Sequence, residues 1–204
     1  MDKATETIKK RYNRMARFFD LSEAVMERGK MGQWRKMVWQ QAKGKVLEVG
    51  VGTGKNIEYY PESITVIAID FSEKMLEKAK AKAEQFHKIV DLRLMDAQKL
   101  EFPDETFDTV ITTCVFCSDP DPVKGLKEIQ RVLKKDGQII MLEHVRSKMP
   151  FVGTIMDLLN PVVVRMVGAN INRNTVENLR KAGLKIEVEQ DLMMDIVKHL
   201  NCKR

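Results

Sequence analysis

The stretch KVLEVGVGTGKN, residues 45–56, decides the fold. A short apolar run that contains one carboxylate, Glu48, leads into three glycines at alternate positions, Gly50, Gly52 and Gly54. Glycine has no Cβ atom, so the backbone can turn tightly there and a ligand can approach it closely. The pattern predicts a strand, then a ligand-binding loop, then a helix whose free N–H groups and positive dipole end face the ligand.

Short β-branched runs alternate with amphipathic stretches along the rest of the chain. The predicted strands are 45–49, 65–69, 90–94, 107–113, 138–145, 185–190 and 195–200. The predicted helices are 54–60, 73–86 with Ser72 as N-cap, 122–134 stopping at Gly137, and 172–183 starting at Asn174 or Thr175. This alternation predicts an α/β fold, a Rossmann-like doubly wound sheet with right-handed crossovers.

Two further segments frame this core. Before residue 45 the chain predicts a helix with apolar residues along one side, namely Ile8, Tyr12, Met15, Phe18 and Phe19. The apolar stretch 151–169 predicts an inserted helical cap and is too interrupted for a membrane span. The expected organisation is an N-terminal helical lid (1–44) and one catalytic domain (45–204), with a cap insert at about 150–170.

Charge and cysteine content limit the functional classes. The 204-residue chain has a net charge of +6, and residues 1–45 carry twelve Lys/Arg against five Asp/Glu. A basic segment suits nucleic acid, an anionic membrane or an acidic substrate, or is simply a solvated helix face. Three cysteines are too few for a disulfide framework, and the polar first seventeen residues lack the apolar core of a signal peptide. A cytoplasmic protein is expected, with peripheral membrane contact left open.

The glycine spacing separates two classes of ligand. A dinucleotide fingerprint is G-x-G-x-x-G, whereas here the third glycine comes one residue earlier. Glu48 would also repel a pyrophosphate. A ligand that lacks phosphate and is cationic at one end fits better, and S-adenosylmethionine (SAM) is such a ligand. Asp70 ends the second predicted strand, where it can accept the ribose hydroxyls, and Asp96 follows the third, where it can accept the adenine amine.

Four motifs in order carry a family resemblance. VLEVGVGTG, AIDFSEKMLEKAK, MDAQKLEFPDETFDTV and LKEIQRVLKKDGQIIMLEH resemble the class I SAM-dependent methyltransferases, in particular the type 11 subgroup. The resemblance covers residues from about 12 to 200. It implies a seven-stranded sheet with the last strand antiparallel, and SAM along the ends of strands one, two and four.

Three subgroups are similar in detail. Val51 between the glycines is similar to bacterial phospholipid N-methyltransferases. RYNRMARFFDL (11–21) resembles the opening of UbiE-like ubiquinone/menaquinone biosynthesis C-methyltransferases, with Asn13 and Phe19 as departures. EHV (143–145) with the later NRNT resembles a membrane-associated thiol S-methyltransferase group. The resemblance therefore implies SAM as cofactor and leaves the acceptor open.

The resemblance also assigns roles to residues. Tyr12 would approach the SAM carboxylate, Gly50 and Gly52 would pass beneath the methionine part, and Asp70 would hold the ribose. Phe71 and Met75 would lie beside the adenine, Asp96 and Ala97 at the base edge, and Thr113 and Cys114 near the sulfonium. Glu48 and Gly54 are two further predicted cofactor contacts.

Methyl transfer needs alignment more than acid–base chemistry. His144, at the carboxyl end of a predicted strand, is the predicted catalytic base, with a structural histidine as the alternative. Its neighbour Glu143 would point to the opposite face. Cys114 and Cys117 form a C-x-x-C, but neither a redox context nor enough zinc ligands accompany it, so no metal is expected.

The predicted function is a SAM-dependent methyltransferase acting on a lipophilic or small-molecule acceptor, by phospholipid N-methylation or quinone-type C-methylation. The apolar 151–169 stretch and the basic residues of the lid suit a lipid, whereas a packed cap over a soluble acceptor is the alternative. Nucleic acid is not expected, since CVFCSDPD (114–121) lacks the N-P-P-Y tetrapeptide of base-amine methyltransferases. A thiol, RNA or protein methyltransferase and a non-catalytic SAM sensor remain alternatives.

Overall fold

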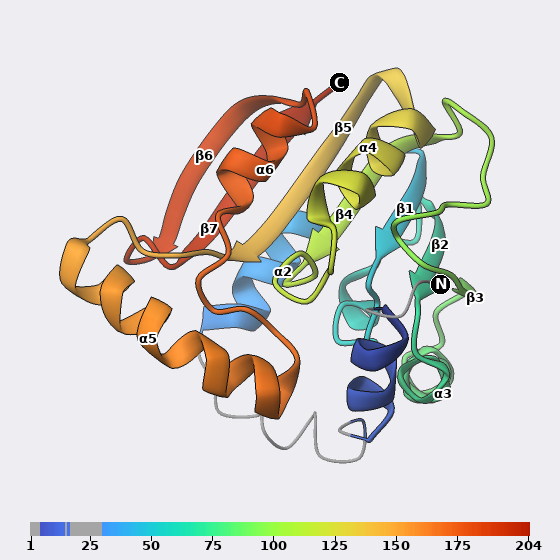
Figure 1. The fold of residues 1–204 in the computed structure, drawn as a ribbon. Helices are drawn as coiled ribbons and strands as arrows, with labels where there is room; N and C mark the ends of the chain where they lie inside the picture. The colour runs from blue at the N-terminus through green and yellow to red at the C-terminus, as the bar shows by residue number, and fades with distance from the viewer. Residues whose placement is uncertain (1–4, 15, 17–29) are drawn as a thin grey trace.

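The computed structural model describes residues 5–14, 16 and 30–204, and every structural statement below concerns these residues (Figure 1). Its centre is one sheet of seven strands in the order β3-β2-β1-β4-β5-β7-β6. The strands are β1 (Lys45–Val49), β2 (Thr65–Asp70), β3 (Asp91–Leu94), β4 (Phe107–Thr113), β5 (Leu133–His144), β6 (Lys185–Met193) and β7 (Val197–Lys203). Strand β7 is antiparallel to both of its neighbours, and the pairs from β3 to β5 are parallel. The predicted doubly wound sheet is confirmed.

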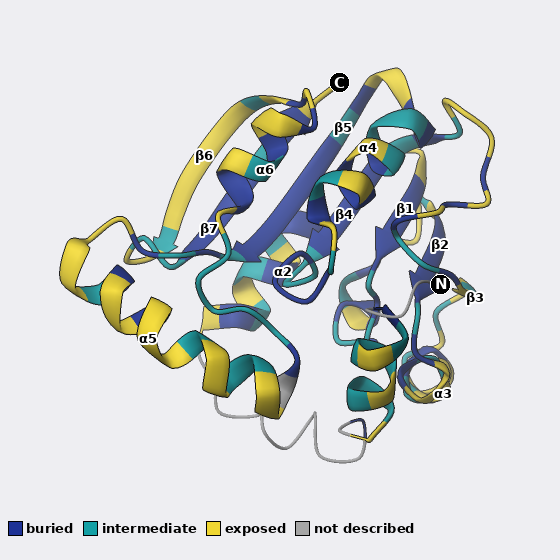
Figure 2. Cartoon of the chain, in the orientation of Figure 1, coloured by how far each residue is buried: buried dark blue, intermediate teal, exposed yellow. Residues whose placement is uncertain are grey.

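Helices pack on both faces of the sheet. The side chains of strand β1 point alternately to the two faces, with apolar side chains on both. The helices are α2 (Gly32–Trp39), α3 (Glu73–Gln85), α4 (Pro122–Val132), α5 (Pro150–Val167) and α6 (Thr175–Lys181), with a short 3₁₀ turn η2 (Ile57–Tyr59). Leu47 lies in the apolar core against α4 and α6, whereas Val46 lies in the core against α2 and α3. Because successive strand residues point to opposite faces, apolar side chains lie on both faces of the sheet. The central strands are accordingly buried (Figure 2).

A helix formed by residues 5–14 lies across the start of α3 (Figure 1). Lys9 forms an ion pair with Glu73 (2.6 Å), and the Ser72 hydroxyl donates to the Asn13 side-chain oxygen (2.6 Å). Ser72 is the N-cap of α3, as predicted, because its Oγ also accepts from the Met75 N–H. These contacts fix the helix beside the carboxyl ends of β2 and β3. Met15, Phe18 and Phe19, predicted to extend its apolar side, lie outside the described residues.

The predicted helix 54–60 is wrong. Only Ile57–Tyr59 forms a helical turn, of the 3₁₀ type. Gly50, Gly52 and Gly54 all have positive φ angles (72°, 55° and 83°), which are incompatible with a right-handed helix, so the loop extends further than the apolar pattern indicates.

The predicted end of the helix 122–134 at Gly137 is also wrong. Helix α4 ends at Val132, and Leu133 is already extended and pairs with Phe107 of β4. Leu133 is fully buried in the core, so tertiary packing overrides the helix propensity of the lysines that follow. The last two strands also run further than predicted, to Met193 and Lys203. Among the described residues, no helix is long and apolar enough to cross a membrane.

Candidate functional site

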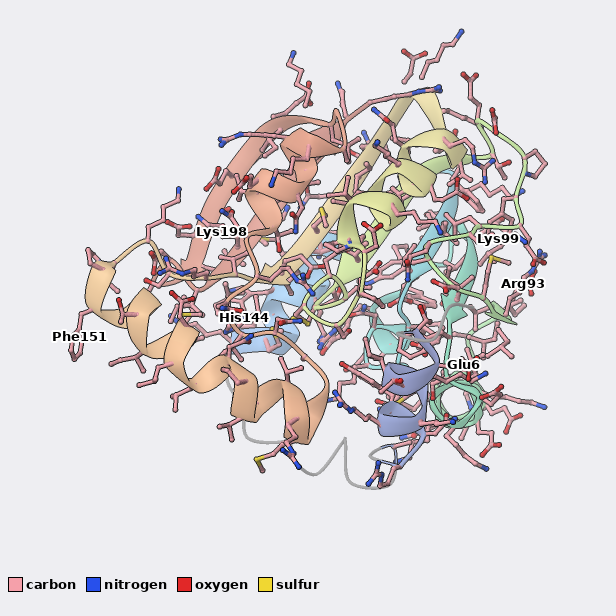
Figure 3. The ribbon with its side chains drawn as sticks, in the orientation of Figure 1. Glu6, Arg93, Lys99, His144, Phe151 and Lys198 are labelled. Carbon is pink, nitrogen blue, oxygen red and sulfur yellow. The ribbon has the colours of Figure 1, made fainter. Side chains whose placement is uncertain are left out.

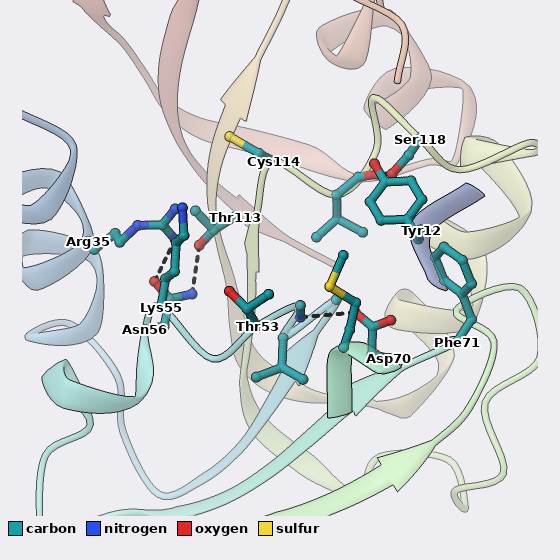
Figure 4. A pocket seen from close by; sticks show the side chains of 15 residues that line it. Tyr12, Arg35, Thr53, Lys55, Asn56, Asp70, Phe71, Thr113, Cys114 and Ser118 are labelled. Atoms are coloured by element: carbon teal, nitrogen blue, oxygen red, sulfur yellow. Dashed lines mark hydrogen bonds between the residues drawn. The ribbon is translucent and has the colours of Figure 1, made fainter. Parts of the chain in front are cut away.

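A hollow lies at the carboxyl ends of β1, β2 and β4, where a doubly wound sheet places its ligands. It consists of two adjoining cavities that share Phe71, Val115 and Ser118 in their walls. Both are open to solvent, and with that solvent they enclose about 640 and 320 Å³. The larger cavity is also lined by Tyr12, Arg35, Gly50, Val51, Gly52, Thr53, Lys55, Asn56, Asp70, Met75, Thr113 and Cys114 (Figure 4). The smaller is also lined by Thr5, Ile8, Asp96, Ala97, Gln98, Asp119 and Pro120.

The glycine loop forms one wall of the larger cavity. At Gly50 a Cβ atom would lie 2.6 Å from Val115, so only glycine fits between β1 and the loop after β4. At Gly52 a Cβ atom would meet no other atom within 4 Å, since that residue borders open space. Gly54, a predicted cofactor contact, lines neither cavity; its missing Cβ allows close packing on Ala79 instead.

Asp70 places a buried carboxylate in the larger cavity. Its Oδ2 accepts from the Gly52 N–H and its Oδ1 from the Ser72 N–H, both at 2.9 Å. Desolvation by burial raises the pKa of Asp70 to about 6. The two backbone bonds fix the carboxylate beside the glycine loop, in a position to accept further hydroxyl donors.

Glu48 lies beneath this loop and not in the cavity wall. It is fully buried, and its carboxylate accepts from the Asn56 amide (2.6 Å) and from the Tyr60 hydroxyl. Burial raises the pKa of Glu48 to about 7. Asn56 also donates to the Thr113 hydroxyl (3.1 Å), so this network ties the glycine loop to the end of β4. Glu48, a predicted cofactor contact, therefore lines neither cavity, and its carboxylate holds the loop.

Arg35 of helix α2 supplies a cation that the sequence patterns do not indicate. Its side chain lines the larger cavity but is only 6% exposed, and its guanidinium donates to the Asn56 side-chain oxygen (2.8 Å). Since helix α2 precedes β1 in the chain, only the fold brings Arg35 to the glycine loop.

An aromatic wall closes the cavity toward the N-terminal helix. The rings of Tyr12 and Phe71 meet edge to face, with centroids 5.6 Å apart. Met75, almost fully buried, completes this side. The structure thus brings three predicted cofactor contacts together.

The smaller cavity contains two carboxylates. Asp96 accepts from the Gln98 N–H (2.9 Å), which shapes the turn after β3, and Ala97 lies beside it. Asp119 is 8% exposed, and its Oδ2 has no hydrogen-bond partner among the described residues. Burial raises the pKa of Asp119 to about 7. Sequence reasoning missed Asp119, although the SDPD turn after the fourth strand is a signal that could have found it.

The loop after β4 is held from below by Glu143. This fully buried carboxylate accepts from the Thr112 hydroxyl (2.7 Å) and from the N–H groups of Val115 and Phe116 (3.3 Å each). Cys114 starts the loop with a positive φ of 55°, a conformation that a non-glycine residue rarely adopts, and lines the larger cavity with Thr113.

His144, the predicted base, lines neither cavity. It is half-buried at the carboxyl end of β5, between the sheet and α5 (Figure 3), and burial lowers its pKa. Glu143 accepts from the Thr112 hydroxyl of β4 and from the loop after β4, so no hydrogen bond in the described part of the chain joins it to His144. The cysteines are free, and within residues 5–14, 16 and 30–204 no group of three or more His, Cys, Asp or Glu could hold a metal ion.

Comparison with known proteins gives a family match over part of the chain. A family model described as a methyltransferase domain matches residues 47–141. Phosphatidylethanolamine N-methyltransferase of Cereibacter sphaeroides is 43% identical over 110 residues, which cover 52% of this chain and 54% of that protein. Demethylmenaquinone methyltransferase of Lactobacillus johnsonii is 28% identical over 205 residues, covering 91% and 84%. The chain spans about half the length of the first of these relatives.

Solved structures confirm the fold. The [4+2]-cyclase SpnF superposes with a TM-score of 0.67 at 18% identity, covering 86% of this chain and 80% of its own. A SAM-dependent methyltransferase from Aquifex aeolicus gives a TM-score of 0.58 at 21% identity, covering 78% and 80%. SpnF shares this fold but is named as a [4+2]-cyclase, so the fold alone does not determine the reaction.

The residues of the site suit the cofactor that the motifs predict. The glycine loop borders open space at Gly52, a buried carboxylate lies beside it at Asp70, and the buried residue Asp119 lines the adjoining cavity. The methyltransferase-domain match over residues 47–141 and the seven-stranded fold agree with these features, so this part of the chain is similar to the S-adenosylmethionine-dependent methyltransferases.

Proposed function

We propose that this protein transfers a methyl group from SAM to a lipid acceptor, with the amine of a phospholipid as the leading candidate. The observation that carries the proposal is the buried Asp70 carboxylate, held by the Gly52 N–H at the mouth of the glycine loop. Bound SAM supplies an electrophilic methyl group on a sulfonium. The residues of this chain bind that group, orient it and exclude water around it.

The larger cavity offers groups that suit the ribose and the methionine carboxylate of SAM. Asp70 would accept the ribose hydroxyls, and the buried guanidinium of Arg35 would attract the methionine carboxylate. Tyr12 lies beside Phe71 on the opposite side of the cavity (Figure 4). Gly50 and Gly52 allow the backbone to approach, and Thr113 and Cys114 border the reacting end.

The smaller cavity suits the adenine. Phe71 and Met75 provide apolar contact at the junction of the two cavities, and Asp96, Ala97 and Asp119 border the base edge. Asp119 adds an acceptor beside Asp96, which suits an exocyclic amine with two N–H donors.

The lipid acceptor is supported by the relatives and by the surroundings of the site. The relative from Cereibacter sphaeroides is named for phosphatidylethanolamine, and it has the higher identity of the two relatives described above. The helix formed by residues 5–14 lines both cavities, through Thr5, Ile8 and Tyr12, and its Arg11 contacts α5 at Val164, which supports a lid and a cap at this site. A quinone-type ring carbon is the second candidate, because the menaquinone relative covers 91% of this chain.

His144 is the candidate base for either acceptor. Because burial lowers its pKa, the imidazole is neutral near pH 7 and able to take a proton from an ammonium or a carbon acid. His144→Ala should lower turnover without weakening cofactor binding. Equal turnover of the variant and the wild type across the pH range would assign His144 to structure.

The test is SAM-dependent turnover with S-adenosylhomocysteine (SAH) release as the readout. The acceptors are phosphatidylethanolamine vesicles, a demethylated quinone, an alkyl thiol and bulk RNA. Turnover on phosphatidylethanolamine supports the leading candidate, and turnover on the quinone alone supports the second. Turnover confined to the thiol or RNA overturns both, and cofactor binding without any turnover favours a sensor.

A further inference from the structure

Helix α5 leaves an unusual apolar surface uncovered. Among its described side chains only Gly153 and Met156 are buried, and Phe151, Leu158 and Met166 are 79%, 77% and 71% exposed. Phe151 points away from the body of the protein (Figure 3), and most of the helix is exposed (Figure 2). The exposed apolar residues are Phe151, Ile155, Leu158, Leu159, Val162 and Met166, whose helical spacing makes one continuous face.

The turn between β6 and β7 extends this face. Asp195 in that turn accepts from the Ser147 hydroxyl (2.7 Å) and from the Lys148 N–H, which fixes the turn against the start of α5. Met193 and Met194 in the turn are 46% and 64% exposed. The apolar surface is therefore formed by both α5 and the turn between β6 and β7, which Asp195 holds together.

Cations flank both ends of the face. Arg11 of the N-terminal helix donates to the Val164 carbonyl of α5 (2.9 Å), so this basic helix lies beside the end of α5. Lys10 and Arg14 on that helix are exposed, as is Arg165 on α5. At the other end Lys148 has a side chain that is 74% exposed and forms an ion pair with Glu189 (3.3 Å). The one acidic residue of α5, Asp157, is paired with Arg146 (2.7 Å).

We propose that α5 is a membrane-docking helix that lies in the headgroup region of an anionic bilayer, with Phe151, Leu158 and Met166 in the acyl boundary. An apolar helix face edged by basic residues is complementary to such a surface, because the bilayer presents phosphates outside and hydrocarbon beneath. A second copy of the chain is a poorer occupant, because a two-fold contact would bring the flanking cations of both copies together.

Docking through α5 would turn the cofactor site toward the lipid. The N-terminal helix, which carries Tyr12 over the larger cavity, and α5 lie at the same end of the molecule (Figure 1). The docking itself is independent of methyl transfer, whereas delivery of a lipid to the site rests on the proposed function.

The experiment is flotation of the purified full chain with vesicles of phosphatidylcholine alone or mixed with phosphatidylglycerol, at low and high salt. We expect binding to the anionic vesicles that weakens with salt. Phe151→Glu and Leu158→Glu should each reduce partitioning at least about tenfold, because an apolar anchor is replaced by a charge. The matched control is Ile89→Glu, which changes a 99% exposed residue at a distant edge and should bind as the wild type does.

Two double charge reversals test the role of the basic residues. Lys10→Glu with Arg14→Glu should weaken binding to anionic vesicles, whereas Lys80→Glu with Lys135→Glu, the same charge change at exposed positions elsewhere, should have less effect. Absence of vesicle binding, or equal loss in Ile89→Glu and Leu158→Glu, overturns the proposal. So does a dimer in sedimentation that Leu158→Glu dissociates. SAH titration distinguishes the docking proposal from the proposed function. A protein that binds SAH but not vesicles contradicts membrane docking by α5 and leaves the cofactor site supported.

Discussion

The floor of the cofactor cavity and the outer face of α5 lie at the same end of the molecule and are built in opposite ways. In the floor, the carboxylates of Glu48, Asp70 and Glu143 are all buried and accept hydrogen bonds from fixed donors. On α5, the large apolar side chains of Phe151 and Leu158 face outward. A network of buried polar groups holds side chains in one geometry. A patch of exposed apolar groups instead marks a surface that contacts an apolar partner. The first region suits a polar ligand held in one pose, and the second suits a nonpolar surface.

The largest expected effect comes from removing the carboxylate of the floor. Asp70→Ala should weaken SAH binding by about 100-fold or more, because a hydrogen bond to a charged group contributes roughly 1.5–3 kcal/mol and two are lost. Calorimetric titration with SAH measures this. Asp91→Ala, an exposed carboxylate at the sheet edge, is the control and should leave binding unchanged. Wild-type affinity in Asp70→Ala would contradict the assignment of the ribose site.

The two cavity glycines should separate stability from binding. Gly50→Ala places a Cβ atom 2.6 Å from Val115 and also incurs the left-handed backbone cost of about 1–2 kcal/mol, so it should lower the free energy of unfolding markedly. Gly52→Ala incurs only the backbone cost, because its Cβ atom meets nothing within 4 Å, yet it fills space beside the ligand. Urea unfolding with SAH titration tests both. Equal stability of the two variants would show that the Val115 contact relaxes.

Most of the fold follows from local pattern, and the exceptions have a physical reason. A short run rich in β-branched residues predicts the strand β4 at its observed bounds, because a strand buried on both faces has such residues on both sides. Local pattern fails at Leu133, where pairing with β4 decides the backbone, and after Gly50, where positive φ angles extend the loop. Both exceptions depend on partners that are distant in sequence or on glycine conformations that a hydrophobicity pattern does not encode.

The candidate site divides in the same way. Gly52 and Asp70 are predictable, because a turn and a strand end position them with no help from the rest of the chain. Arg35 and Asp119 are not, since each reaches the cavities only after a helix packs on the sheet or a loop folds back. Glu48 is predicted as a contact but serves the loop from beneath, because an alternating strand turns its side chain into the core.

A pH measurement can sharpen the description of the floor. Burial raises the pKa of Glu143 to about 7 from 4.5, so the folded state keeps a proton that the unfolded chain releases. The contribution of this group to stability is full below about pH 4.5 and is lost as the pH rises toward 7. Glu143→Gln cannot titrate. The unfolding free energy of the wild type minus that of Glu143→Gln should therefore fall with pH across this window, by at most about 1.4 kcal/mol per unit.

Chemical denaturation at pH 5 and pH 7 measures this difference. Glu101→Gln, at an exposed position, is the control and should show no comparable trend. A difference that stays constant or rises with pH would mean that Glu143 is ionised in the folded state and holds the loop after β4 as a carboxylate.

The smallest effect on the domain itself is expected on α5. Leu158 is 77% exposed, so Leu158→Glu should change the free energy of unfolding by less than about 0.5 kcal/mol and leave SAH binding intact. Turnover on detergent-dispersed phosphatidylethanolamine should also stay near the wild-type rate, because the floor is untouched. Turnover on the same lipid in anionic vesicles should fall several-fold, since the acceptor is then reached only from the surface. An equal loss in detergent and in vesicles would mean that α5 shapes the cavity, and the contrast between a rigid floor and an outward apolar face would not hold.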